Sequence, residues 1–305
     1  MPKSSMMACR KPPKASYFEL VYHPVTAGYI YHDMMISTAK NNLYADQGRN
    51  SANTIADHVR DLFDQDQLLT KEYHELLGGK WNHMMDQTHI GYQYWQQPMR
   101  QVLPPLKYVA SMERSLVGDM MVGIQGSNAS VPGDDRWHSL GSTSLTMDPF
   151  DRYGQPQWLE IFHVGTLPFD WTITANASWV NFSQTSGSLA PNDSDVRVWV
   201  TIDWDSVPAD SHHLVQVNIT RSEDNATQYL QQALYGAQFN MPQLYLPINN
   251  TQLPANFTNG FVESNGLVSI DLDHWSSISP IQPHPSSSVC TPTQLPTYTN
   301  RSAGG

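Results

Sequence analysis

Cysteine, positive charge and long apolar runs are scarce in this chain of 305 residues. Its two cysteines, Cys9 and Cys290, both lie near an end of the chain, which excludes a disulfide framework and a cysteine-based zinc site. Charged residues make up 15% of the sequence, and the net charge is −11 at pH 7. Within residues 128–290, sixteen acidic residues stand against four arginines. Such a surface repels a phosphate backbone, so we expect no nucleic-acid partner.

Apolar runs are too short for a membrane anchor, because none reaches the roughly 20 residues that span a bilayer. We therefore expect no membrane partner. The first seventeen residues are basic and polar with no apolar segment behind them, so the sequence predicts no signal peptide.

Acceptor triplets for N-glycosylation are in excess, since about three are expected by chance and nine are present. The acceptors are Asn128, Asn176, Asn181, Asn192, Asn218, Asn225, Asn249, Asn256 and Asn300. Composition alone produces some triplets in a region rich in Asn, Ser and Thr, but this excess in a lysine-poor chain favours an extracellular parent protein. Because no signal peptide is visible, we expect the true N-terminus to be missing.

Two apolar periods follow one another along the chain. Up to about residue 100, apolar residues recur at three- and four-residue steps, which predicts a helical bundle. The first predicted helix carries Phe18, Val21, Tyr22, Val25, Tyr29, Ile36, Ala39 and Leu43 on one stripe and stops at Gly48. A second, from Ser51, carries Ile55, Val59, Leu62 and Phe63. A third carries Leu68, Leu69, Tyr73, Leu76 and Leu77 and ends at Gly78 and Gly79.

Beyond Pro98 the period changes to two. Apolar residues at 196, 198, 200 and 202, and again at 215, 217 and 219, alternate with other residue types, which predicts strands with one buried face. Further strand-like runs lie at 159–164, 169–175 and 179–182. About six such strands suffice for a β-sandwich.

The sequence therefore predicts an α+β protein in separate units, a helical bundle followed by an antiparallel β-sandwich. The expected division is a disordered basic tail at 1–15, the bundle at 16–100, a linker at 101–115, the sandwich at 116–240 with an inserted loop at 128–148, a linker with the first strand of a truncated β module at 241–275, and a disordered tail at 276–305.

Chemistry-bearing side chains are densest at residues 79–98. The segment contains Trp81, His83, Asp86, His89, Tyr92 and Trp95. On a helix, the two histidines and the aspartate would share an arc of roughly 120°, which allows a metal site. Their spacing matches no recognised zinc pattern, and the favoured interpretation is a buried hydrogen-bonded network packed by the aromatic residues. Contact with a neighbouring domain is the other alternative. We expect no metal or cofactor and leave the role of the segment open.

Other side chains give weaker signals. Acid–base hydrolysis of a sugar bond needs two carboxylates about 5 to 10 Å apart. The aspartate pairs at 134 and 135, 148 and 151, and 203 and 205 are typical of solvated loops, so we assign no catalytic residue. Tryptophans at 158, 171, 179, 199 and 204 crowd the predicted sandwich, where core or inter-domain packing is the favoured role. Trp199, on the face opposite the valines, is the candidate for contact with a sugar.

A longer pattern surrounds these residues. Residues 78–98 read GGKWNHMMDQTHIGYQYWQQP and resemble a hallmark of glycoside hydrolase family 115, the xylan α-1,2-glucuronidases. The resemblance continues in NNLYADQGRNSAN at 41–53, HVRDLFDQDQLLTKEYHELL at 58–77, MDPFDRYGQPQWLEIFHVGTLPFDWTITANASWV at 147–180, VWVTIDW at 198–204 and GFVESNGLVSIDLDHW at 260–275. It covers about residues 16–275.

The resemblance implies a multidomain parent in which an α/β domain and a catalytic (β/α)8 barrel precede a helical bundle and β-sandwich modules. A barrel takes about 250 residues, and only fifteen precede the match, so we expect this chain to lack it. The implied function is that of a fragment of a secreted enzyme that removes glucuronic or 4-O-methylglucuronic acid from xylan, inactive alone. The implied partners are a glucuronoxylan-type polysaccharide and, in a homodimer, a second copy. A non-catalytic carbohydrate-binding or scaffold module is the alternative, so whether the chain is an enzyme stays open.

Overall fold

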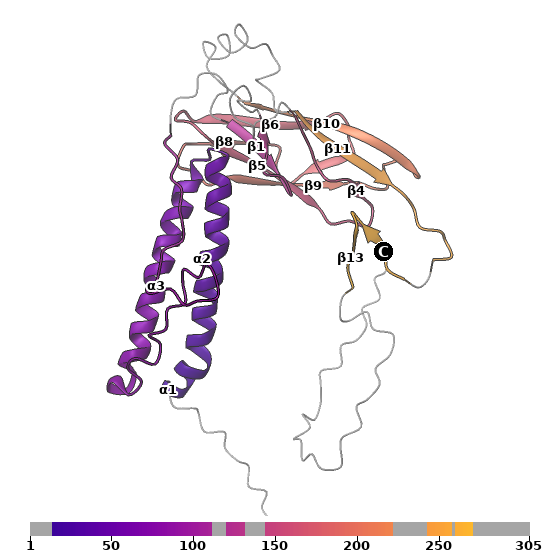
Figure 1. Ribbon diagram of the computed structural model, residues 1–305. Helices are drawn as coiled ribbons and strands as arrows, with labels where there is room; N and C mark the ends of the chain where they lie inside the picture. Colours follow the sequence, from indigo (N-terminus) through magenta and orange to yellow (C-terminus); the bar gives the residue numbers. More distant parts are fainter. Residues whose placement is uncertain (1–13, 112–119, 132–143, 222–242, 258–259, 271–305) are drawn as a thin grey trace, which may run out of the picture. The chain divides into compact units, whose positions relative to one another are not determined.

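The computed structural model describes residues 14–111, 120–131, 144–221, 243–257 and 260–270 (Figure 1). The chain divides into two compact units, Met1–Thr258 and Asn259–Gly305. Among the described helices, none combines the length and the apolar content that crossing a bilayer requires. The expected tail at 276–305 lies outside the described residues, as does most of the tail at 1–15.

Two long helices, in place of the expected three, form the first part of the larger unit. Helix α2, His23–Asp46, and helix α3, Ser51–Gly79, lie side by side as a hairpin (Figure 1). The short helix α1, Lys14–Tyr17, and the π-helical turn η1, Phe18–Tyr22, precede them. The prediction of a separate third helix is wrong, because the apolar stripe of α3 continues in phase through Leu69 and Tyr73.

Glycines end both helices, as the sequence predicts. Gly48 has φ +72°, and the amide of Arg49 donates to the Tyr44 carbonyl across it, which closes α2. At the other end, Leu76 leaves helical geometry, and Gly78 and Gly79 also have positive φ. The two stops set the length of the hairpin.

The buried face of α2 differs from the predicted stripe. Its buried residues are Ile30, Met34, Ser37, Asn41 and Tyr44. Of the predicted stripe, Phe18 is buried, whereas Val21, Tyr22, Val25, Tyr29 and Ile36 are exposed. Apolar residues occur all around α2, so its periodicity alone did not identify the face that meets α3.

An extended segment covers the helix pair in the place of a third helix. The side-chain amide of Asn41 donates to the Lys107 carbonyl and accepts from the Lys107 amide, both at 2.9 Å. Asn53 pairs with Val109 in the same way, at 2.8 and 2.7 Å. The described part of the expected linker is therefore attached to the helices through its backbone.

Two sheets follow. The first has the order β2-β1-β5-β9-β7 and is antiparallel throughout. Its strands are β1 Met120–Ile124, β2 Ser130–Val131, β5 Gln157–His163, β7 Val180–Phe182 and β9 Val196–Ile202. The second has the order β3-β11-β10-β6-β8, with β4 also pairing β11. Its strands are β3 Ser144–Thr146, β4 Phe150–Asp151, β6 Phe169–Ala175, β8 Ser186–Leu189, β10 Ser211–Arg221 and β11 Gln243–Asn250. Because β3 and β4 run parallel to β11, this sheet is mixed and not purely antiparallel as expected.

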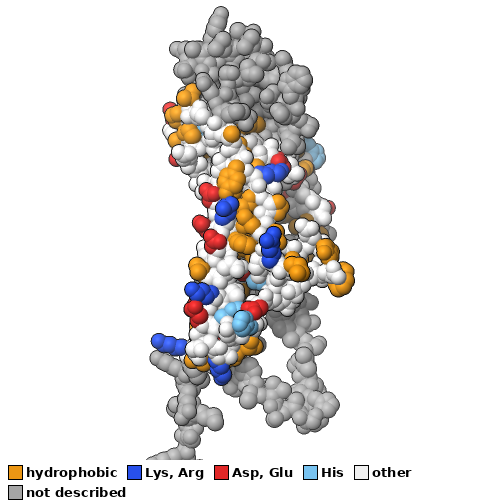
Figure 2. Space-filling view, turned by 60° about the vertical axis from the view of Figure 1, so that its left-hand side comes forward, with side chains coloured by type: hydrophobic (Ala, Val, Ile, Leu, Met, Phe, Trp, Pro, Cys, Tyr) orange, Lys and Arg blue, Asp and Glu red, His pale blue; other side chains and the backbone are white. Residues whose placement is uncertain are grey.

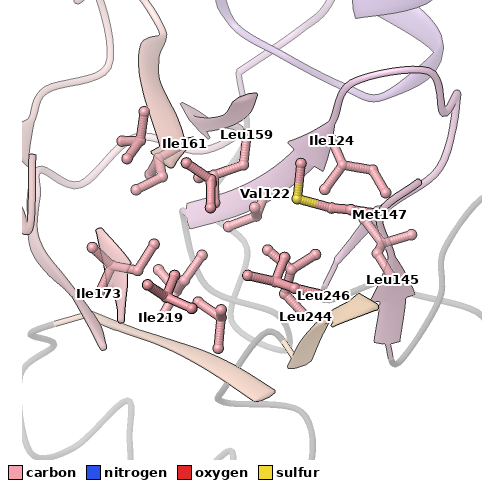
Figure 3. Close-up of a cluster of buried hydrophobic side chains, with 14 of the residues drawn as sticks. Val122, Ile124, Leu145, Met147, Leu159, Ile161, Ile173, Ile219, Leu244 and Leu246 are labelled. Atoms are coloured by element: carbon pink, nitrogen blue, oxygen red, sulfur yellow. The ribbon is translucent and has the colours of Figure 1, made fainter. Parts of the chain in front are cut away.

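The sandwich core lies between these sheets. Val122, Leu159 and Ile161 of the first sheet and Ile219 and Leu244 of the second belong to one buried cluster (Figure 3). In β9 and β10 the buried positions are the valines and isoleucine that the period of two singles out. The alternation predicted from the sequence is confirmed there.

Two of the expected irregular segments contain strands. Strand β11 falls in the expected linker at 241–275, although Leu244, Leu246 and Ile248 alternate and are buried. Pro247 hides this pattern, since proline is rare inside sheets. Along β11 it lies between the residues that pair with β3 and those that pair with β4. Strands β2 and β3 likewise occupy the ends of the expected loop at 128–148, and residues 132–143 lie outside the described residues.

The second unit contains a small hairpin. Strands β12, Glu263–Ser264, and β13, Leu267–Val268, pair antiparallel. Asn265 and Gly266 between them have φ of +51° and +77°, as a two-residue hairpin turn of type I′ requires. The single strand expected near 261–271 therefore turns back on itself.

Candidate functional site

The segment at 79–98 begins where α3 ends, away from the sandwich (Figure 1), and after Gly79 it is not helical. After the glycine stop the chain forms turns, and His83 has the left-handed φ of +71°. A non-glycine residue rarely adopts this conformation. The helical arc that would align His83, Asp86 and His89 is therefore absent from the structure.

Histidines of this segment pair with carboxylates in two separate places. His83 Nδ1 lies 2.7 Å from Asp86 Oδ2, and both side chains are exposed. Asp86 Oδ1 also lies 3.6 Å from His74 Nε2. His74 Nε2 accepts a hydrogen bond from the backbone amide of Met85. His89 instead pairs with Asp66 of α3, with 2.8 Å between His89 Nε2 and Asp66 Oδ1. Charged and histidine side chains accordingly appear at the surface of this region (Figure 2).

The pair of His89 and Asp66 is the more enclosed of the two. Asp66 is buried on α3, and Gln101 donates to His89 Nδ1 at 2.9 Å. The hydrogen bond with Asp66 raises the pKa of His89, against the effect of partial burial. This contact fixes the segment to the helix and to the extended chain that follows.

The structure bears differently on the two interpretations of the segment, a metal site and a buried hydrogen-bonded network. His83 and Asp86 do not converge with His89, and no cluster of three metal-ligating side chains occurs within the described ranges. A hydrogen-bonded network does form, but the expectation that it is buried is wrong at His83 and Asp86. Trp81 packs on the helix core, whereas Tyr92 is 44% and Trp95 is 86% exposed. The aromatic residues therefore do not cover the network.

The five tryptophans of the sandwich separate into two groups. Trp171 is buried in the core, and Trp179 and Trp204 pack against it, as favoured for the set. Trp199 is 43% exposed on the outer face of β9, as its alternation predicts. Sequence reasoning did not single out its cross-strand neighbour Trp158, which lies directly opposite on β5. The β5 run identified in the sequence began at residue 159, one residue too late to include it.

These two tryptophans border a hollow on the outer face of the first sheet. The hollow has a volume of about 500 Å³ and is lined by Gln125, Gln155, Pro156, Trp158, Trp199 and Thr201. A second hollow of about 230 Å³ shares Gln155, Pro156 and Thr201 and reaches Trp204. The Arg197 guanidinium lies 3.9 Å from the Trp158 ring centre and also donates to Glu160, so it is held beside the hollow.

Aspartates near the second hollow have structural partners. Asp205 forms an ion pair with Arg152 at 2.7 Å, and Asp203 accepts a hydrogen bond from Ser206. Asp151 accepts the Tyr153 amide. The pair at 134 and 135 lies outside the described residues.

A buried ionic cluster joins the hairpin to the sandwich, and the sequence did not identify it. Arg49, 3% exposed, extends from the turn between α2 and α3. Its Nη1 donates to Glu160 Oε2 at 2.6 Å and to Asp195 Oδ2 at 2.8 Å. Its guanidinium lies 3.8 Å from the Tyr44 ring centre and 3.9 Å from that of Phe162. Planar stacking and forked hydrogen bonds are specific to arginine, so lysine cannot substitute for it here.

The pKa values of the two carboxylates in this cluster shift in opposite directions. Burial alone would raise the pKa of Glu160, but hydrogen bonds from Arg197 and Arg49 lower it below the usual value. Burial raises the pKa of Asp195 despite Arg49. Burial likewise raises the pKa of Tyr44, which donates to Glu160 Oε2 at 2.9 Å.

Gly123 on β1 makes room for the cluster. A Cβ atom at this position would lie 2.9 Å from Arg49 Nη2 and 3.5 Å from the Phe162 ring. Asn50 strengthens the same junction, donating from its side chain to the carbonyls of Gly165 and Pro191. The turn of the hairpin is thus held by ionic, aromatic and amide contacts at once.

The predicted glycosylation acceptors are largely at the surface. Asn128, Asn176, Asn181, Asn192 and Asn256 are exposed, and Asn218 and Asn249 are half-buried. Asn225 and Asn300 lie outside the described residues. Their modification stays a prediction.

Comparisons with known proteins add little. Neither a protein-family model nor a curated protein matches the chain. Solved structures with partial similarity include the periplasmic chaperone SfaE, at 9% identity over 37% of this chain and 59% of the chaperone, with a TM-score of 0.26. A Bacteroides ovatus GH5 xyloglucanase in complex with a XXXG heptasaccharide has 14% identity over 46% of this chain and 21% of the enzyme, with a TM-score of 0.23. The ASH / PapD-like domain 7 of human CEP192 has 12% identity over 53% of this chain and 99% of the domain, with a TM-score of 0.26. The chain thus spans less than two thirds of the first two, and these scores assign neither family nor function.

Proposed function

We propose that this chain is the non-catalytic helix-and-sandwich part of a secreted enzyme similar to the family 115 glycoside hydrolases. The parent enzyme would remove glucuronic or 4-O-methylglucuronic acid from xylan, with its catalytic carboxylates in another domain. The role of the present residues would be to hold the hairpin and the sandwich in a fixed arrangement.

The observation that carries this proposal is where the family-like stretches meet. Residues 41–53 supply Tyr44, Arg49 and Asn50 to the junction, and residues 147–180 supply Glu160 and Phe162. The family-like stretch at 58–77 contacts the one at 78–98 through Asp66 and His89. Stretches that resemble the family separately along the sequence therefore also contact one another in the fold, as expected of a shared structural unit.

An exposed apolar stripe on α2 agrees with a larger parent. Val25, Tyr29 and Ile36 are 67%, 62% and 67% exposed and lie at helical spacing. Exposed apolar side chains that line up on a helix commonly mark a surface that packs against another element. A further helix of the parent's bundle is an occupant of the right kind.

The two carboxylates at the junction are unsuited to catalysis. Glu160 and Asp195 share Arg49 as a partner, but both are buried and paired. A glycosidase acid needs access to the sugar and a proton to donate. The family's catalytic role is therefore not proposed for them.

A direct assay tests the proposal. The purified chain is expected to release no uronic acid from glucuronoxylan, and release would contradict a non-catalytic role. Mapping the 5′ end of the transcript tests whether this chain is part of a larger parent enzyme. A continuous frame that encodes a barrel upstream of Met1 would support it, whereas stop codons immediately upstream would count against it.

A second candidate function is carbohydrate binding without catalysis. The exposure of Trp199 beside Trp158 favours it. It is compatible with a non-catalytic part of a polysaccharide-degrading enzyme.

A further inference from the structure

We infer that the hollow at Trp158 and Trp199 binds the uncharged backbone of a polysaccharide built of pyranose rings. The choice of a xylan-type backbone among such polysaccharides rests on the function proposed above. The site lies on the outer face of the first sheet and uses none of the residues at 79–98.

The aromatic pair provides the apolar surface. Trp158 and Trp199 are direct partners in the register of β5 and β9, so their side chains project from the same face. Trp199 is 43% exposed, although burial is the usual fate of so large an apolar side chain. One face of a pyranose ring presents mainly C–H groups, which pack on an indole ring as other apolar groups do.

Polar groups around the pair match the rim of a sugar ring. Gln155 and Thr201 line the hollow and are exposed. Gln125 Oε1 accepts a hydrogen bond from the backbone amide of Trp158 at 3.3 Å, which holds the Gln125 side chain in place. Amide and hydroxyl groups both donate and accept hydrogen bonds, as sugar hydroxyls do. An apolar surface with a few fixed polar groups is the usual composition of a small-molecule site.

The uncharged lining of the hollow favours the neutral polysaccharide backbone over a uronic acid substituent. None of the six lining residues is charged. The nearby Arg197 donates to Glu160 at 2.7 Å and stacks on Trp158, so its charge is already paired. A carboxylate in the hollow would lose water without gaining a free cation, which is unfavourable. We therefore expect binding that changes little with salt concentration.

The size of the site favours a chain of rings. The hollow of about 500 Å³ lies within the usual range of roughly 300 to 1,000 Å³ for ligand sites. The adjoining hollow of about 230 Å³ shares three of its lining residues and extends the surface toward Trp204. Longer oligosaccharides should bind more tightly than a single sugar.

Isothermal titration calorimetry on the full chain tests the inference. The protein is produced without glycans, because the acceptor Asn181 lies opposite Thr201 in the sheet and a glycan there could cover the hollow. The ligands are xylohexaose, cellohexaose and free glucuronic acid. We expect Trp199→Ala to weaken xylohexaose binding about tenfold or more, and Gln155→Ala about fivefold. Leu214→Ala is the matched control, since Leu214 is 63% exposed on the other sheet.

The outcomes separate the site from the parent function. Binding of xylohexaose that Trp199→Ala weakens and Leu214→Ala retains supports both. Cellohexaose binding with the same dependence, but no xylohexaose binding, supports the saccharide site and contradicts the xylan assignment. Absence of binding to either oligosaccharide, preference for glucuronic acid, or binding unchanged in both Trp199→Ala and Gln155→Ala overturns the site. The chain could instead bind no saccharide and form a dimer that Trp199→Ala dissociates in analytical ultracentrifugation. That result would identify the hollow as a contact between copies and would overturn the saccharide site.

Discussion

The two ends of the helix hairpin contain similar ionic groups in opposite surroundings. At the sandwich end, Arg49 is 3% exposed and holds two carboxylates between aromatic rings. At the far end, His83 is 75% and Asp86 is 55% exposed. Of these two regions, only the first joins segments that are more than 100 residues apart. A dense motif in sequence therefore does not identify the most deeply buried ion pair that the structure describes.

Removing the Arg49 side chain should have the largest effect. Arg49→Ala leaves Glu160 and Asp195 buried without their shared cation, which should lower the free energy of unfolding by about 3 to 5 kcal/mol. Urea denaturation followed by tryptophan fluorescence measures the change. The matched control is Arg152→Ala, which removes the solvent-exposed pair with Asp205 and should cost less than about 1 kcal/mol. Equal losses in the two variants would erase the distinction between the buried cluster and a surface pair.

A smaller, pH-dependent effect is expected at His89. Because its pKa is raised above the usual 6.5, its pair with Asp66 contributes full stability below pH 6.5 and loses it as pH rises through the folded-state pKa. His89 is 40% exposed, so the contribution should stay below about 1 kcal/mol.

Titration of His89 by NMR measures this pKa directly. Asp66→Asn should return it toward 6.5, whereas Asp86→Asn should leave it unchanged. A His89 pKa at or below 6.5 in the wild type would contradict the pairing.

The smallest effect is expected at His83. Its partner Asp86 and its own side chain are both exposed, so His83→Ala should change the free energy of unfolding by less than about 0.5 kcal/mol. Alanine inherits the same left-handed backbone, so the variant isolates the side-chain pair from the strain. Thermal unfolding provides the measurement, and a loss comparable to that of Arg49→Ala would show that the far end also holds the fold together.

The sequence predicted the strands whose pattern is local. In β9 and in residues 215–219 of β10, the apolar side chains alternate with other types, and the structure buries them as the alternation predicts. Strand β11 has the same alternation but contains Pro247, a residue that is rare inside sheets. This proline lies between the residues that pair with β3 and those that pair with β4. The hairpin turn at Asn265 and Gly266 was missed despite its familiar dipeptide. That dipeptide favours a tight turn, which divides the final strand into β12 and β13.

The junction was not predictable by periodicity. Arg49 is one polar residue in a turn, and Glu160 interrupts an apolar strand, so neither suggests the other in sequence. The buried face of α2 was misassigned for a related reason, because its buried polar residue Asn41 bonds to Ala52 and Lys107 on other segments of the chain. Trp199, by contrast, was placed by alternation alone, while its neighbour Trp158 required the register of β5 against β9.

The side-chain amides of Asn41 and Asn53 have a consequence for how this protein tolerates change. They form hydrogen bonds with the backbone amides and carbonyls of Lys107 and Val109, and none of these bonds involves the side chains of those two residues. Substitutions at those two positions should therefore be accepted widely, except for proline, which has no amide hydrogen to donate. Inserting or deleting one residue between them would misalign one of the two amide pairs. In evolutionary terms, the length of this segment between Lys107 and Val109 should therefore be more strictly fixed than the identity of those two residues.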